Sequence, residues 1–148
     1  MKKVNIFLDS SALIAGVLST TGAAHTLFMF GEDETILLTV SEWVVIESEE
    51  AISRKSPKNI KALRHSLLAS KFQIVPDPSN EEIQANLYLI RDPQDVPVLL
   101  AAIKAKVDYL ATHDHKHFIN DPKVAERAGI KIGTPGDVLA WIRENLNE

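Results

Sequence analysis

The stretch from Asp92 to Asp114 constrains the fold of this 148-residue chain more than any other segment. The apolar run VPVLLAAIKA follows Asp95, whose side chain we expect to accept backbone N–H groups of a helix that begins there; Pro97 is tolerated in that first turn. The short apolar segment 108–112 is followed by polar residues, as a buried parallel strand is. Asp114 is therefore expected just past the C-terminal end of a strand, where ligand sites gather in open α/β sheets.

The rest of the chain alternates segments typical of strands and of helices. We predict strands at 4–8, 35–40, 72–75, 108–112 and 130–132. We predict helices at 10–18, 22–31, 42–54, 57–70, 79–90, 96–105, 124–128 and 138–146, with a polar loop at 115–122. This alternation indicates a parallel sheet covered on both faces. The predicted fold is α/β: one domain over residues 1–148, built as a three-layer α/β/α sandwich with a central parallel sheet.

Composition narrows the possible classes of protein. Apolar residues make up 45% of the chain and charged residues 24%, as in ordinary soluble globular proteins. The absence of cysteine excludes disulfides and thiolate metal sites. Because no apolar run approaches the ~20 residues that span a bilayer and no signal-peptide pattern is present, we expect a cytoplasmic protein.

Charge is unevenly distributed along the chain. The net charge of −4 argues against a broad nucleic-acid surface, but six Lys and Arg residues and no acid lie between Arg54 and Lys71. This basic stretch could follow an RNA backbone or could be an ordinary solvated helix, and the sequence favours neither interpretation. The candidate RNA-binding residues are Arg54, Lys58, Lys61 and Arg64.

Three aspartates occupy positions from which they could meet. Asp9 and Asp114 each follow an apolar strand, so they emerge at one edge if those strands are neighbours, and Asp95 at its helix start can join them. A glutamate of the 42–54 helix is the natural fourth acid, but periodicity places Glu47 and Glu49 about equally. Taken singly, each aspartate is better explained without a functional role, Asp9 and Asp95 as helix caps and Asp114 as a turn residue, and only their joint placement favours a site.

Clustered carboxylates repel one another unless they are protonated, paired or bridged by a cation. Carboxylate oxygens suit hard divalent ions, here Mg²⁺ or Mn²⁺. Such ions hold phosphates and lower the pKa of bound water. The acids therefore predict metal-dependent phosphodiester hydrolysis.

Three segments resemble a PIN domain: IFLDSSALIAG, SEWVVIE, and DPQDVPVLLAAIKAKVDYLATHD with Phe118. The similarity runs from about Val4 to Asp137 and is greatest to small prokaryotic PIN proteins, many of them VapC-like toxins. The resemblance implies an α/β/α sandwich and a Mg²⁺- or Mn²⁺-dependent endoribonuclease that cuts single-stranded RNA. The likeness to toxins adds the expectation of a toxin role with an antitoxin protein as partner.

The resemblance also assigns residues. The family's acids fall on Asp9, Glu47, Asp95 and Asp114, which form the implied catalytic and metal-binding set. Its Thr-x-Asp pattern falls on 112–114, so the Thr112 hydroxyl is expected to orient a carboxylate or water. Ser10 is a candidate supporting donor. Some relatives carry a further acid where this chain has His117, a departure that bears on a second metal rather than on the first.

Competing interpretations come from other classes of protein. One is a non-catalytic PIN-fold module that binds RNA or protein; another is a phosphoacceptor domain, which we rank low because the paired acids it requires are missing. For His113, His115 and His117 we favour a solvated loop over a Zn²⁺ site, since no second histidine cluster completes a tetrahedral set. Both tryptophans are expected to pack, and Trp43 is also a candidate contact in a homodimer.

Overall fold

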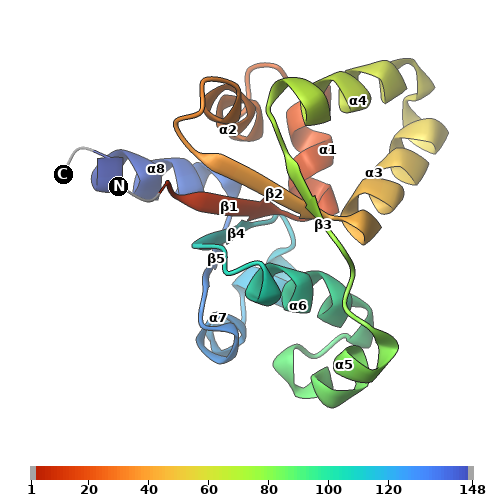
Figure 1. Cartoon of the computed structure of the whole chain (residues 1–148), viewed down its shortest axis with the longest axis vertical. Helices are drawn as coiled ribbons and strands as arrows, with labels where there is room; N and C mark the ends of the chain where they lie inside the picture. Colours follow the sequence, from red (N-terminus) through yellow and green to blue (C-terminus); the bar gives the residue numbers. More distant parts are fainter. Residues whose placement is uncertain (1–2, 147–148) are drawn as a thin grey trace.

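The computed structural model describes residues 3–146, and within them five strands form one parallel sheet (Figure 1). The strand order is β3-β2-β1-β4-β5, and every neighbouring pair is parallel. The strands are β1 (Asn5–Leu8), β2 (Leu37–Ser41), β3 (Gln73–Val75), β4 (Tyr109–Ala111) and β5 (Lys131–Gly133). The five predicted strands are thus confirmed, with small shifts at their ends.

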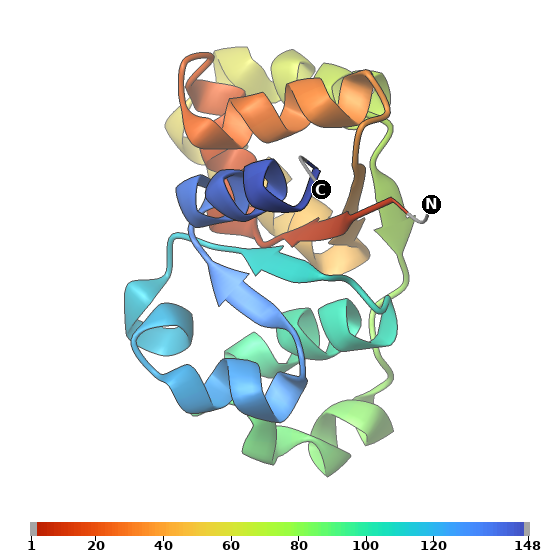
Figure 2. The ribbon, with the colours of Figure 1, turned by 90° about the vertical axis from the view of Figure 1, so that its left-hand side faces the viewer.

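Helices cover both faces of this sheet. The α-helices are α1 (Ser10–Leu18), α2 (Ala23–Glu32), α3 (Glu42–Lys55), α4 (Ile60–Ala69), α5 (Asn80–Ala85), α6 (Val96–Lys104), α7 (Pro122–Ala128) and α8 (Pro135–Leu146). Figures 1 and 2 show α1, α2 and α8 on one side of the sheet and α6 and α7 on the other. The predicted three-layer α/β/α architecture is confirmed.

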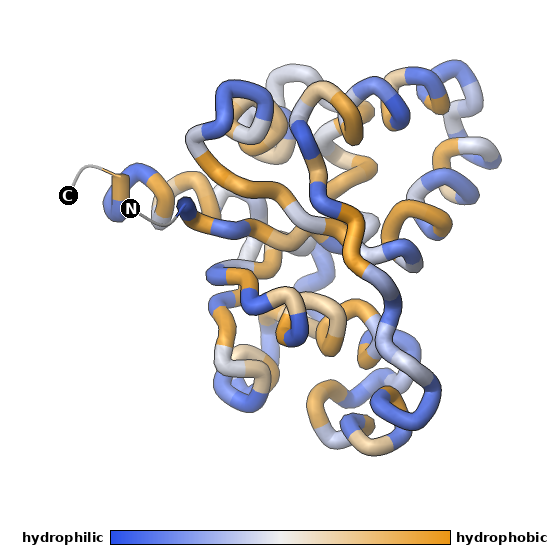
Figure 3. The backbone as a smooth tube through the Cα atoms, in the orientation of Figure 1, coloured by the Kyte–Doolittle hydropathy of each residue, from blue (hydrophilic) through white to orange (hydrophobic). Residues whose placement is uncertain are grey.

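The register of the central strand determines what meets at the edge of the sheet. Strand β1 lies between β2 and β4, and Ile6, Phe7 and Leu8 are fully buried. Figure 3 shows hydrophobic residues running through the central strands. Leu8 pairs with Ala111 of β4, and the Asp9 N–H donates to the Ala111 carbonyl at 3.2 Å. The residues that follow these two strands are therefore held side by side.

Several helix starts carry the caps that the sequence predicts. Ser41 accepts the Val44 N–H at 3.3 Å, and Asp9 accepts the Ala12 N–H at 3.0 Å. One prediction is wrong: Asp95 precedes α6 but its side chain accepts no backbone N–H there. A 3₁₀ turn, Pro93–Asp95, precedes α6 instead, and Asp92 caps that turn by accepting the Gln94 N–H at 3.0 Å. The Asp95 carboxylate therefore makes no capping hydrogen bond to its own helix.

Three other segments differ from the prediction. The helix predicted at 79–90 ends at Ala85, where the Asn86 side chain donates to the Glu82 carbonyl at 2.7 Å, and a 3₁₀ turn follows at Leu87–Leu89. The polar loop predicted at 115–122 is instead a π-helical turn, His115–Ile119, followed by the start of α7 at Pro122. The helix predicted from 57 begins with a 3₁₀ turn, Pro57–Asn59.

The two tryptophans behave differently. Trp141 packs against Tyr109, with ring centroids 5.4 Å apart, as predicted. Trp43 is 45% exposed and is not a core residue, so of its two predicted roles the contact in a homodimer stays a prediction.

Among the described residues, no single helix combines the length and apolar composition needed to cross a membrane. Helices α1 and α2 meet that criterion only as a pair, and the chain bends by 88° between them.

Candidate metal centre

Four acidic side chains line one cavity at the C-terminal edge of the sheet. The cavity has a volume of about 180 Å³, and its acids come from the ends of β1 and β4, from α3 and from the start of α6. Its lining residues are Asp9, Ser10, Ser11, Glu47, Asp95, Val98, Asp114 and Phe118. The fold therefore brings together the four acids that were expected to meet.

Asp9 is the most buried of these acids, with 7% of its surface exposed. Its Oδ1 accepts hydrogen bonds from Ser11 Oγ at 2.6 Å and from the Ala12 N–H, and its Oδ2 accepts one from Thr112 Oγ1. Burial raises the pKa of the Asp9 carboxyl above its ordinary value of 3.8, although these hydrogen bonds oppose the rise. Asp9 is thus a helix cap and also a rigidly oriented carboxylate.

Two hydroxyl groups fasten the end of β1 to the end of β4. Thr112 is fully buried, and its Oγ1 donates to Asp9 and accepts the Asp114 N–H at 2.9 Å. Ser11 Oγ, besides donating to Asp9, accepts the His113 N–H at 2.9 Å. Thr112 therefore orients a carboxylate, as expected. Ser11 was missed, although its place two residues after a capping aspartate was a usable signal.

The structure separates Glu47 from Glu49. Glu47 lines the acidic cavity and accepts a hydrogen bond from Ser10 Oγ. Glu49 instead forms an ion pair with Arg64 of α4 at 2.8 Å. Ser10 thus supports Glu47 rather than its neighbour Asp9, because the packing of α1 against α3 places it there.

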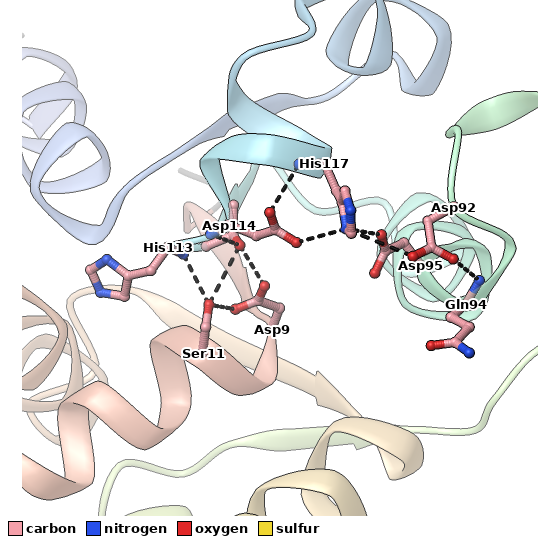
Figure 4. Close-up of polar contacts among 9 residues, drawn as sticks. Asp9, Ser11, Asp92, Gln94, Asp95, His113, Asp114 and His117 are labelled. Carbon is pink, nitrogen blue, oxygen red and sulfur yellow. Dashed lines mark hydrogen bonds and ion pairs between the residues drawn. The ribbon is translucent and has the colours of Figure 1, made fainter.

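Asp95 and Asp114 face His117, which enters from the π-helical turn (Figure 4). His117 Nδ1 lies 3.0 Å from Asp95 Oδ2 and 3.3 Å from Asp114 Oδ2. It also lies 3.9 Å from Oδ2 of Asp92. The prediction of a solvated loop is therefore wrong for His117, whereas His113 and His115 are exposed.

The electrostatics of Asp95 reflect this crowding. Burial, together with the nearby charges of Asp92 and Asp114, raises the pKa of the Asp95 carboxyl to about 6, against the opposing influence of His117. Its Oδ2 is buried and contacts His117 Nδ1 at 3.0 Å, an ion pair when the imidazole is protonated. Sequence reasoning missed Asp92 and His117 as members of this cluster.

The candidate RNA-binding residues lie apart from the acids. Arg54, Lys58, Lys61 and Arg64 belong to the end of α3, the following 3₁₀ turn and α4, and none of them lines the acidic cavity. Arg64 is paired with Glu49, and Arg54 lines a surface groove together with Glu49 and Glu50. Their role in RNA binding stays a prediction.

The donor set suits a hard divalent cation. It consists of carboxylate oxygens, and burial, with a smaller contribution from neighbouring carboxylates, raises the pKa values of Asp9 and Asp95. A cation would supply the positive charge that these groups lack. The residues at the cavity therefore fit Mg²⁺ or Mn²⁺.

Comparison with known proteins identifies the family. The model of the PIN domain matches residues 5–116, which include all four acids of the cavity. The chain therefore belongs to the PIN-domain family. Among curated proteins, no sequence is similar enough to count as a match.

Solved structures with the same fold share little sequence with this chain. PAE2754 from Pyrobaculum aerophilum is 17% identical, with a TM-score of 0.65 over 95% of this chain and 90% of that one. VapBC2 from Rickettsia felis, solved bound to a DNA fragment from its promoter, is 17% identical, with a TM-score of 0.63 over 88% and 98%. Mycobacterium tuberculosis VapC20, a toxin that cleaves the sarcin–ricin loop, is 16% identical, with a TM-score of 0.53 over 75% and 91%.

Proposed function

We propose that this PIN-domain protein is a metal-dependent endoribonuclease that hydrolyses phosphodiester bonds of single-stranded RNA. The observation that carries the proposal is the convergence of Asp9, Glu47, Asp95 and Asp114 on one cavity. Such a concentration of acids in a partly buried site lowers the stability of the fold and is typical of catalytic and metal-binding sites.

These four acids would hold Mg²⁺ or Mn²⁺, which supplies positive charge to phosphate oxygens and lowers the pKa of water for attack at phosphorus. Asp9 is kept in one orientation by three hydrogen bonds, so its oxygens need little rearrangement to act as ligands. Thr112 links Asp9 to Asp114 by bonding to both segments, which holds the separation between these two acids. Ser10 donates a hydrogen bond to the Glu47 carboxylate and so restricts the orientation of that side chain.

The test is cleavage of a fluorophore–quencher single-stranded RNA by the purified protein in Mg²⁺ or Mn²⁺. We expect Asp9→Asn to abolish cleavage while circular dichroism and thermal melting show an intact fold. Glu47→Gln should lower the rate, whereas Glu49→Gln on the same helix serves as the matched control and should not.

Cleavage that survives both Asp9→Asn and EDTA would refute the proposal. RNA binding without any metal-dependent loss of substrate would identify the chain as a non-catalytic PIN-fold module instead.

We further propose a toxin role with an antitoxin protein as partner, supported by the likeness in fold to VapBC2 and VapC20. Inducible expression of the chain should arrest growth of a bacterial host, and Asp9→Asn should not. Unimpaired growth together with cleavage in vitro would favour a housekeeping ribonuclease. A cytoplasmic location and a homodimer stay predictions, the latter testable by light scattering after size-exclusion chromatography.

A further inference from the structure

We propose that Arg91 and Lys116 hold the phosphate backbone of a single-stranded RNA at the rim of the acidic cavity, and that Tyr88 stacks on a base of the same strand. The inference rests on the proposed function, because it places the substrate strand of that reaction. The candidate residues of the basic stretch Arg54–Lys71 do not line the cavity, so the strand needs other contacts close to the acids.

The acidic cavity needs positive charge at its rim if RNA is to approach it. Its four carboxylates carry up to four negative charges, and one divalent cation offsets two of them. A phosphate that approaches therefore meets net negative charge unless further cations stand beside the cavity. Within residues 3–146, the only lysine or arginine residues next in sequence to a member of the acid–histidine cluster are Arg91, which precedes Asp92, and Lys116, which precedes His117.

The two cations belong to segments that the fold holds against each other. Arg91 lies just before the 3₁₀ turn that leads into α6, and Lys116 lies in the π-helical turn after β4. His117 Nδ1 in the second segment lies 3.0 Å from Asp95 Oδ2 and 3.9 Å from Asp92 Oδ2 in the first (Figure 4). These contacts fix both cation-bearing segments at one side of the cavity, which Asp95 itself lines.

Both cations are available to a ligand. Arg91 and Lys116 are exposed, and neither forms an ion pair within the part of the chain that the structure describes. The lysine and arginine ion pairs found there engage other cations, namely Arg64, Lys71 and Lys104. A phosphate bound by Arg91 or Lys116 would therefore displace no protein carboxylate.

Tyr88 adds an aromatic surface to the segment that carries Arg91. Tyr88 is 66% exposed, whereas the next two residues, Leu89 and Ile90, are buried and anchor the chain. Its ring takes part in none of the aromatic pairs found among residues 3–146. Four residues separate it from Asp92, a chain length of about 14 Å at most, so the base of a nucleotide near the bound phosphate can reach it.

This combination of contacts selects the form of RNA that binds. Cations that follow a phosphate backbone, together with an aromatic ring on which a base stacks, bind single strands with little dependence on sequence. In a duplex the bases are already stacked on one another and cannot pack on an external ring. The rim therefore favours single-stranded over double-stranded RNA.

The test of the cations measures binding of a fluorescein-labelled single-stranded RNA by anisotropy in EDTA, where no metal-dependent cleavage occurs. Replacing Arg91 and Lys116 together by Ala should lower the magnitude of the slope of log K against log salt by about 1.4. If this contribution vanishes in about 1 M salt, binding weakens about 60-fold at about 0.05 M salt and about tenfold at about 0.2 M. The matched control replaces the exposed cations Arg127 and Lys131 by Ala at the opposite edge of the sheet, and should leave the slope unchanged.

The test of stacking uses Tyr88 in the same assay. Tyr88→Ala should weaken binding of the single strand about 5- to 150-fold, whereas Tyr88→Phe keeps the ring and should bind as the wild type does. Binding of a duplex of the same sequence should not depend on Tyr88. Because the side chain is exposed, thermal melting should be the same for all three proteins.

An unchanged salt slope in the variant that lacks Arg91 and Lys116 would overturn the inference. So would an equal loss in the control that lacks Arg127 and Lys131, since it would show that net charge alone attracts RNA. A loss in Tyr88→Phe as large as that in Tyr88→Ala would overturn the stacking contact. Failure of the proposed function is distinguishable, because it would appear as RNA binding that depends on Arg91 and Lys116 without metal-dependent cleavage.

Discussion

Neutralising Asp95 should stabilise the metal-free protein while it removes function. Asn has nearly the same shape as Asp, so Asp95→Asn deletes a charge and leaves packing intact. In the folded chain this carboxyl has a pKa of about 6, chiefly because it is buried, whereas 3.8 is its ordinary value. At neutral pH the folded state therefore bears an ionised group that it holds less favourably than the unfolded state does.

The magnitude follows from that difference. The gap between 3.8 and about 6 corresponds to about 3 kcal/mol, at 1.36 kcal/mol for each pKa unit. Because 22% of the side chain is exposed, solvent screening reduces our expectation to about 2 kcal/mol. The sign is fixed by proton binding: between about pH 4 and 6 the folded state binds more protons than the unfolded state. Wild-type stability should therefore rise as the pH falls from 7 towards 4.5.

Urea denaturation of EDTA-treated protein at pH 7.5 and pH 5 measures both effects. Asp95→Asn should be about 2 kcal/mol more stable than the wild type at pH 7.5, and the gap should narrow at pH 5. Mn²⁺ should stabilise the wild type by about 3 kcal/mol at a hundredfold excess over its dissociation constant, and the variant by much less. A variant that is less stable than the wild type at pH 7.5 would refute the electrostatic account and make Asp95 a structural residue.

Other changes test separate parts of the structure. Thr112→Val should cost about 2–4 kcal/mol in unfolding free energy, because it removes the hydrogen bond to the Asp9 carboxylate and leaves the Asp114 backbone N–H without its acceptor. Thr112→Ser keeps the hydroxyl and should cost less than about 1 kcal/mol, so equal losses in both variants would contradict this account. Reversing the charges of Lys58 and Lys61 together should weaken RNA binding, as measured by fluorescence anisotropy. If both side chains contact phosphates, the slope of the logarithm of the binding constant against the logarithm of salt concentration should fall in magnitude by about 1.4. An unchanged slope would identify this stretch as an ordinary solvated helix. Gly16→Ala should lower the free energy of unfolding by about 1–3 kcal/mol, since the new Cβ would lie 2.3 Å from the Phe28 ring. Adding Phe28→Leu should recover part of the lost stability in a thermal melt, and no recovery would exclude this clash as the cause.

The basis of the site was already visible along the chain. Strands and helices alternate with periods that local side chains impose, so the parallel sheet and the positions of Asp9 and Asp114 after their strands followed from pattern alone. The parallel register then required these two residues to emerge at one edge, and β1 and β4 do lie side by side.

Tertiary packing decided the remaining membership of the site. Glu47 and Glu49 flank the same helix face. Only the packing of α3 against α1 and α4 places Glu47 at the cavity and Glu49 in an ion pair with Arg64. Likewise, nothing local shows that Asp95 leaves its capping role or that His117 turns towards it. Periodicity reports which side of a segment is buried, but a site is made where several segments converge, and that depends on distances between elements far apart in sequence.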